Sequence, residues 1–192
     1  MKAIAMVLAM VLMVQDADQA KIDQLIRDLG SSEYTVREKA EEELKKIGAS
    51  AAPALRKALE DKEQIAQVLI DYGRHLDSRD LAAYASLFAA DGEWVGGFGT
   101  VKGRSEIKAF MEKSLGTGPN RNKSFHIMSN FAITVKGDTA TAWSRWTFIT
   151  PGANGATIAQ AGRYDDTFVR ENGAWKFKKR VASNDTAAPA AR

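Results

Sequence analysis

The chain has 192 residues, of which 45% are hydrophobic and 27% are charged, and its formal net charge is +3. This length and composition allow one good core with a small appendage. Charges alternate in sign along the chain, which argues against a nucleic-acid-binding surface. The densest cationic cluster, in residues 176–180, is expected to be the solvated side of a terminal strand. The absence of cysteine excludes disulfides, thiolate catalysis and cysteine-ligated zinc.

The N-terminal segment, residues 1–20, has the pattern of a secretory signal peptide. Lys2 supplies a positive start, and residues 3–14 form an apolar run that is too short to span a bilayer comfortably. Ala17 or Ala20 could end the leader, although neither has a small residue two positions before it. An uncleaved membrane anchor or a buried first helix is the alternative. We therefore expect an exported protein, periplasmic or secreted, if the leader is cleaved, and a membrane-anchored one otherwise.

Residues 21–60 have the pattern of three helices. Apolar residues recur at helical spacing up to Gly30 and again up to Gly48, where the first two helices are expected to end. Ser32 or Thr35 could cap the second helix. A third, short helix follows, and it would tolerate Pro53 in its first turn.

The stretch "LGSSEYTVREKAEEELKKIGASAAPALRKAL" resembles one HEAT-type helical repeat, through the patterns "VR..A...L..IG" and "A.PAL..AL". Such repeats bury their apolar faces against stacked neighbours, and the chain contains no second copy. The segment would therefore pack on the rest of the chain, on another subunit or on a protein partner. A plain helical extension without a recognition role is the alternative.

Residues 61–185 form the main predicted domain. A long amphipathic helix with a break near residues 77–80 is followed by a second helix, a glycine-rich strand pair and a third helix. Strand patterns then cover about 124–136, 139–150, 157–170 and 174–182, with turns at "KGD" and "ENG". Helices followed by an antiparallel meander indicate an α+β fold. Residues 186–192 are expected to form a disordered tail.

Three stretches of this domain resemble the SnoaL-like domain of the nuclear transport factor 2-like superfamily: "IDYGRHLDSRDLAAYASLFAADGEWVG", "FHIMSNFAITVKGDTATAWSRW" and "GRYDDTFVRENGAWKFKKR". They come in the family's order and span about 120 residues. The resemblance implies a cone-shaped, curved antiparallel sheet packed on three helices, a pocket between them, and a homodimer through the sheet. The superfamily holds dehydratases, isomerases, cyclases, epoxide hydrolases and members without known activity, so the fold alone does not define the function.

In the predicted strand at 124–136, the alternation of side chains between the two faces does not put all the core-like residues on one face. His126, Met128 and Asn130 share one face, whereas the core-like Ile133 and Val135 have the opposite parity. Both sets cannot point inward unless the register slips. We therefore predict a bulge at residues 129–131, which would put His126 on the concave side of the sheet.

The resemblance to scytalone dehydratase and bile-acid dehydratase implies a catalytic set of Tyr72, Asp77 and His126. A neutral imidazole at His126 would remove a proton from a carbon beside a carbonyl, and Asp77 would orient it. Tyr72 would hydrogen-bond the developing oxyanion or the leaving hydroxyl. No cofactor and no metal are needed. The further polar side chain that those enzymes carry on a later strand is replaced here by Ala159 and Ala161.

Each of these residues also has a structural interpretation: a hydrogen-bonded core histidine, a helix-capping aspartate and a core tyrosine. Ligand contacts are predicted at Trp94, Phe98, Met128, Asn130, Arg145 and Trp146, although Arg145 could instead be a charge on the outer face. Two functions remain. One is a cofactor-independent lyase or isomerase acting on a small, mostly apolar, oxygenated molecule. The other is a non-catalytic exported module that binds a small ligand or a protein partner.

Overall fold

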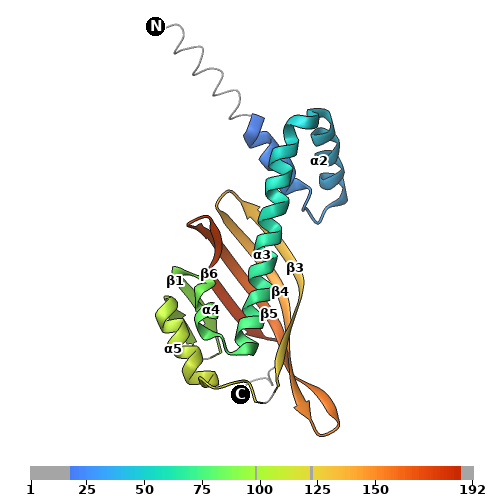
Figure 1. The fold of residues 1–192 in the computed structure, drawn as a ribbon. Coiled ribbons are helices and arrows are strands. Elements are labelled where there is room, and N and C mark those ends of the chain that lie inside the picture. The colour runs from blue at the N-terminus through green and yellow to red at the C-terminus, as the bar shows by residue number, and fades with distance from the viewer. Residues whose placement is uncertain (1–17, 98, 122, 187–192) are drawn as a thin grey trace, which may run out of the picture. The chain divides into compact units, whose positions relative to one another are not determined.

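The computed structural model describes residues 18–97, 99–121 and 123–186 (Figure 1). The chain forms two compact units, Met1–Asp61 and Lys62–Arg192. Most of the expected leader and the tail beyond residue 186 lie outside the described residues. Within the described part, no helix is both long and apolar enough to cross a membrane.

The first unit is helical. Residues 18–28 form one helix, α2 covers Tyr34–Ile47, and a 3-10 turn, η1, covers Gly48–Ala51. Gly48 ends α2 with φ 69°, as expected for a glycine at a helix C-terminus. The expected caps are wrong, because Glu33 occupies the N-cap position and makes no side-chain capping bond. The unit has its own small core, built on Ile22, Leu44 and Ala51.

Helix α3 runs without interruption over Ala52–Ser78. The sequence pattern predicts a short helix up to about residue 60 and a separate long helix after it, and this division is wrong. The junction "LEDKEQI" contains neither glycine nor proline, and most of its residues favour helix, so nothing ends the helix there. Pro53 lies in the first turn, where its missing N–H costs no hydrogen bond.

The break after α3 lies where it was expected. Arg79 takes a left-handed conformation with φ 63°. Asp80 then caps α4, Leu81–Ser86, by accepting a 3.0 Å hydrogen bond from the Ala83 N–H. Helix α5 covers Arg104–Leu115.

The second unit contains one six-stranded sheet of order β2-β1-β6-β5-β4-β3. The strands are β1 Phe88–Gly96, β2 Gly99–Lys102, β3 Phe125–Lys136, β4 Thr139–Gly152, β5 Gly155–Glu171 and β6 Ala174–Asn184. Figure 1 shows α3 passing over one face of the sheet, with α4 and α5 near β1. The α+β class is confirmed. The sheet is mixed rather than wholly antiparallel, because β1 and β6, which are distant in sequence, pair in parallel.

The predicted bulge in β3 is confirmed. The pairing of β3 with β4 shifts between Ser129 and Ala132, and Asn130 takes a left-handed conformation with φ 57°. His126 and Met128 are therefore half-buried on the same side as Ile133, while Asn130 is exposed. Register shifts also interrupt the β4/β5, β5/β6 and β1/β6 pairs, and such bulges bend a sheet.

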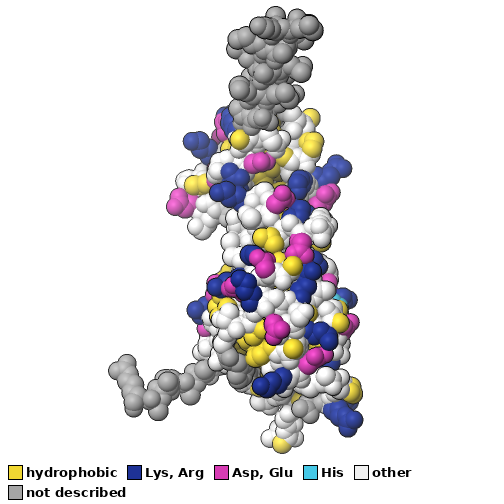
Figure 2. Space-filling view, turned by 90° about the vertical axis from the view of Figure 1, so that its left-hand side faces the viewer, with side chains coloured by type: hydrophobic (Ala, Val, Ile, Leu, Met, Phe, Trp, Pro, Cys, Tyr) yellow, Lys and Arg dark blue, Asp and Glu magenta, His cyan; other side chains and the backbone are white. Residues whose placement is uncertain are grey.

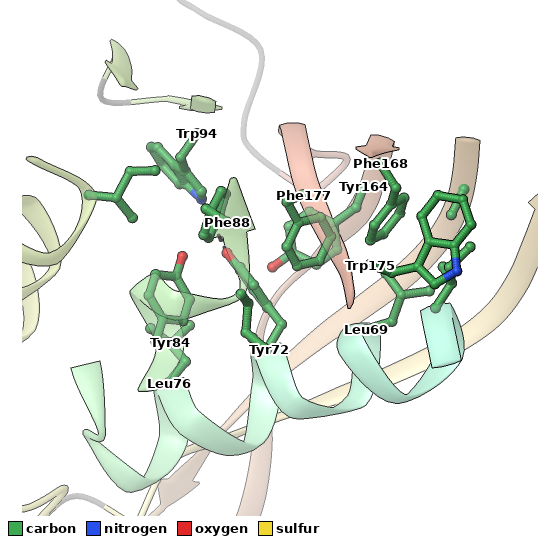
Figure 3. Close-up of a cluster of buried hydrophobic side chains, with 14 of the residues drawn as sticks. Leu69, Tyr72, Leu76, Tyr84, Phe88, Trp94, Tyr164, Phe168, Trp175 and Phe177 are labelled. Atoms are coloured by element: carbon green, nitrogen blue, oxygen red, sulfur yellow. Dashed lines mark hydrogen bonds between the residues drawn. The ribbon is translucent and has the colours of Figure 1, made fainter. Parts of the chain in front are cut away.

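Aromatic side chains fill the core between α3 and the sheet (Figure 3). The Tyr72 and Tyr84 ring centroids are 4.8 Å apart, and those of Phe168 and Phe177 are 4.7 Å apart. On the face of the molecule in Figure 2, Lys and Arg side chains are intermixed with Asp and Glu. The face drawn there therefore carries no broad field of one sign.

Candidate functional site

Asp77 and His126 meet where the last turn of α3 faces the start of β3. Asp77 Oδ1 lies 2.7 Å from His126 Nδ1, and Asp77 Oδ2 accepts a 2.8 Å hydrogen bond from the His126 backbone N–H. The side chains are 20% and 14% exposed, so both remain partly open to solvent. One carboxylate thus fixes both the backbone position and the ring orientation of the histidine.

The surroundings of the pair hold it in place. Asn120 Nδ2 donates to the Asp77 carbonyl oxygen at 3.0 Å and to the Ser124 carbonyl oxygen at 2.6 Å, which ties the end of α3 to the residues before β3. The His126 ring lies 4.7 Å from Phe148 and 6.5 Å from Trp146, both on β4. The imidazole therefore has an aromatic wall on its β4 side.

This geometry assigns the tautomer of the neutral imidazole. A carboxylate only accepts hydrogen bonds, so His126 Nδ1 must carry the hydrogen that it donates to Asp77. Nε2 then keeps its lone pair, and in the described part of the chain this atom has no hydrogen-bond partner. Such an imidazole can act as a general base, with the carboxylate stabilising the imidazolium that forms. Among the described residues, no group of three His, Asp or Glu side chains could hold a metal.

Tyr72 does not join this pair. Five residues along a helix correspond to a rotation of about 140°, so Tyr72 and Asp77 point in different directions from α3. The Tyr72 hydroxyl accepts a 3.1 Å hydrogen bond from Trp94 Nε1 inside the aromatic core, as the dashed line in Figure 3 marks. The structure thus unites two of the three predicted catalytic residues and places the third beside Trp94.

An ion pair that the sequence reasoning missed lies within this core. Arg180 donates to both oxygens of Asp166 at 2.8 and 2.7 Å, and both side chains are fully buried. The Arg180 guanidinium lies 3.9 Å from the ring centroids of Tyr72 and Tyr164. The expectation that residues 176–180 form a solvated face is therefore wrong for Arg180.

The pKa shifts of the two partners favour opposite charge states of the pair, so the geometry decides between them. Burial alone would lower the pKa of Arg180, but the charge and hydrogen bonds of Asp166 outweigh it and raise the pKa. For Asp166, burial raises the pKa, and this effect is larger than the lowering caused by the charge and hydrogen bonds of Arg180. The two-pronged geometry is that of a guanidinium with a carboxylate, so the charged pair is the consistent assignment.

Two polar atoms near this ion pair, Arg180 Nη1 and Tyr84 Oη, are buried without a hydrogen-bond partner among the described residues. Burial raises the pKa of Tyr84 and of Tyr164 well above the usual value, so both phenols remain protonated. The core under α3 therefore holds hydrogen-bond donors in a largely apolar setting.

The predicted ligand contacts divide into two groups. Trp94 and Trp146 are buried and Met128 is half-buried, all within the core of the second unit, and Phe98 lies outside the described residues. Arg145 lies on the outer face, where it pairs with Asp185 and stacks on Trp143 at 5.2 Å.

Asn130 is exposed at the bulge, because the extra residue there turns its side chain away from the core. Arg145 and Asn130 are thus removed from the predicted lining.

Comparison with known proteins agrees with this architecture. The chain is 30% identical over 129 residues to the uncharacterized protein Rv2910c of Mycobacterium tuberculosis, a match that covers 64% of this chain and 84% of the relative. A nuclear transport factor 2-like protein with a cystatin-like fold from Novosphingobium aromaticivorans is 27% identical, with a TM-score of 0.65 over 74% of this chain and 93% of that one.

A candidate scytalone dehydratase from Novosphingobium aromaticivorans is also similar, at 27% identity and a TM-score of 0.57 over 70% of this chain and 91% of that one. A sequence model of the SnoaL-like domain matches residues 57–181, which include most of α3, strands β1 to β5, most of β6 and the Asp77–His126 pair. The chain therefore belongs to the SnoaL-like domain family.

Proposed function

We propose that the protein is a cofactor-independent lyase or isomerase of the dehydratase type, acting on a small, mostly apolar, oxygenated molecule. The observation that carries the proposal is the doubly bonded Asp77–His126 pair, which leaves Nε2 of a half-buried imidazole with a free lone pair. The similarity to a candidate scytalone dehydratase supports the same class of reaction.

The proposed elimination uses His126 as its base. His126 Nε2 takes the proton from the carbon beside a carbonyl group, and the electrons of the broken C–H bond form an enolate. The enolate re-forms the carbonyl as the β-carbon–oxygen bond breaks. The leaving hydroxide takes the proton back from the imidazolium, so the products are water and an unsaturated carbonyl compound. Isomerisation would use the same base, which returns the proton to a different carbon.

The oxyanion of the enolate would gain from a hydrogen-bond donor. We propose Tyr72 for this role by its chemistry, although its hydroxyl lies beside Trp94 in the aromatic core and outside the Asp77–His126 pair. Its oxygen accepts from Trp94 Nε1, and this contact does not use the hydroxyl hydrogen. The Arg180 guanidinium on its ring adds positive charge nearby. A donor preorganised in an apolar interior stabilises developing negative charge strongly.

The aromatic surroundings support an apolar substrate. Phe148 and Trp146 lie beside the imidazole, and Met128 follows it on the same side of β3. Such side chains bind hydrocarbon surface and exclude water from a reactive enolate.

The test is to incubate the full chain with a panel of β-hydroxy ketones in D₂O and to follow alkene formation and α-deuteration by proton NMR. His126→Asn and Asp77→Asn should lower the rate by about 10²–10⁴-fold, the usual range for a positioned base. His75→Asn is the matched control, because His75 is the other histidine of the chain and lies on α3, the helix that carries Asp77. Turnover that is unaffected by His126→Asn would contradict the proposal.

A further inference from the structure

A second feature of the same unit lies beside the Asp77–His126 pair. A hollow of about 630 Å³ opens between the end of α3, the end of α5, the loop before β3 and the C-terminal end of β4. Its lining consists of Arg79, Ser114, Leu115, Arg121, Lys123, Ser124, Phe148, Thr150 and Pro151. We refer to it as the basic hollow.

The lining carries three cationic side chains, Arg79, Arg121 and Lys123, and no Asp or Glu. None of the three forms an ion pair with a carboxylate in the described part of the chain. Several other cations in this unit are paired with carboxylates, as Arg163 is with Asp185. Uncompensated cations around a concavity concentrate positive potential and attract anions.

The lining also contains apolar side chains. Leu115, which is 38% exposed, lines the hollow together with Phe148 and Pro151. A hollow lined by both cations and hydrocarbon matches a ligand with an anionic group and an apolar body.

Hydrogen bonds anchor the loop that supplies two of the cations. Asn120, next to Arg121, bonds the Asp77 and Ser124 carbonyl oxygens. The Ser124 hydroxyl is buried and donates to Asn120 Oδ1 at 3.3 Å. The cations of the basic hollow are thus tied to the same structural elements that hold Asp77 and His126.

Phe148 connects the two features, since it lines the hollow and its ring lies 4.7 Å from the His126 ring. An apolar body resting on Phe148 would therefore lie next to the imidazole. The hollow can hold the anionic end of a molecule whose other end reaches the base.

We propose that the basic hollow binds an organic anion, with a carboxylate or phosphate group on Arg79, Arg121 and Lys123 and an apolar body on Leu115, Phe148 and Pro151. As a statement about the substrate of His126, this rests on the proposed function. As a statement about binding, it stands on the lining alone. The two outcomes can be separated by experiment.

The test measures binding of 2-naphthoate, 1-naphthyl phosphate and neutral 2-naphthamide to the full chain by isothermal titration calorimetry. At least one of the two anions should bind with a Kd below about 1 mM, and the amide at least ten-fold more weakly. Because the attraction is electrostatic and solvent-exposed, raising the salt concentration should weaken binding of the anion. The relative strength of carboxylate and phosphate identifies the anionic group.

The variant Arg121→Gln/Lys123→Gln should weaken anion binding at least ten-fold, and both side chains are exposed, so the fold should be unaffected. Lys136→Gln, which removes an exposed cation at the far end of β3, is the matched control and should bind as the wild type does. Equal affinity for the anions and the amide, or equal affinity in the double variant and the wild type, would overturn the proposal.

His126→Asn separates this proposal from the proposed function. The basic hollow should still bind the anion in that variant, because His126 is not part of its lining. Retained anion binding without turnover of any compound would leave the hollow intact and contradict the lyase. The opposite result is turnover that requires His126 but is unchanged in the double variant, together with no anion binding. That result would contradict the proposal for the basic hollow and leave the proposed function standing.

Discussion

Asp77 binds His126 at two places at once, through Oδ2 to the backbone N–H and through Oδ1 to Nδ1. The first contact fixes the start of β3 against the end of α3, and the second orients the imidazole. The structural and the chemical interpretations of Asp77 therefore do not compete. The same carboxylate serves both purposes, and substitutions can separate them.

Asp77→Ala should destabilise the second unit more than Asp77→Asn. The alanine removes both contacts, and the loss of hydrogen bonds to a partly exposed carboxylate should cost about 1–2 kcal/mol of unfolding free energy. Asparagine keeps an oxygen that can accept from the His126 N–H. Urea denaturation of the two variants compares them directly, and equal destabilisation would show that the backbone contact contributes nothing.

Removing the hydroxyl group should change the stability of the protein differently at two tyrosines of the core. Tyr72→Phe leaves Trp94 Nε1 without its acceptor and should cost about 1 kcal/mol or more. Tyr84→Phe removes a buried hydroxyl without a hydrogen-bond partner in the described part of the chain, so stability should be unchanged or rise by up to about 1 kcal/mol. Thermal unfolding measures both, and a loss at Tyr84→Phe as large as at Tyr72→Phe would refute the contrast.

Backbone conformation sets the expectation at the β3 bulge. Asn130 has φ 57°, a conformation that asparagine and glycine tolerate and β-branched residues do not. Asn130→Val should therefore lower the unfolding free energy by about 1–2 kcal/mol. Asn130→Gly is the matched control and should change it little. Because the side chain is exposed, a similar loss in both variants would mean that its contacts, and not φ, decide the effect.

Glu171 gives the protein a specific sensitivity to acid. The Ala90 N–H donates to it at 2.9 Å and Arg104 forms an ion pair with it, so its pKa in the folded state lies below the ordinary 4.5. A lowered folded pKa contributes stability that is fully present above pH 4.5 and is lost as the pH falls through the folded pKa. Stability curves at several pH values should show a shallower acid decline in Glu171→Gln than in the wild type. Parallel declines would contradict this assignment.

The sequence predicted the fold class and the β3 bulge because both follow from local patterns. The parity conflict between His126 and Ile133 can be resolved only by an extra residue, and the structure places it where expected. The sequence pattern does not predict the continuity of α3, because the spacing of apolar residues changes near residue 60 although no residue there breaks a helix.

The buried ion pair could not be read from alternation. Trp175 and Phe177 face inward, which would put Lys179 inward and Arg180 outward on a regular strand. The β5/β6 register instead skips one residue after Phe177, so that Arg180 turns into the core opposite Asp166. A bulge inside a cationic run leaves no sequence signal, because the run has the same composition on either side of it.

The site was predictable only in part for a similar reason. Resemblance to known dehydratases identified Asp77 and His126, but the direction of Tyr72 depends on helix rotation and on the Trp94 partner. The basic hollow draws its residues from four separate parts of the chain, and no short stretch contains them. Export, homodimer formation and a partner role for residues 21–60 stay predictions.

The most direct test of the account is the tautomer of His126, measured by nitrogen-15 NMR of the labelled imidazoles at a pH at which the spectrum itself shows a neutral ring. The wild type should carry its hydrogen on Nδ1 and leave Nε2 unprotonated. In Asp77→Asn the amide oxygen is held by the His126 backbone N–H, so its NH₂ group faces Nδ1 and should shift the hydrogen to Nε2. A wild-type imidazole protonated at Nε2, or the same tautomer in both proteins, would contradict the role of Asp77 in preparing the base.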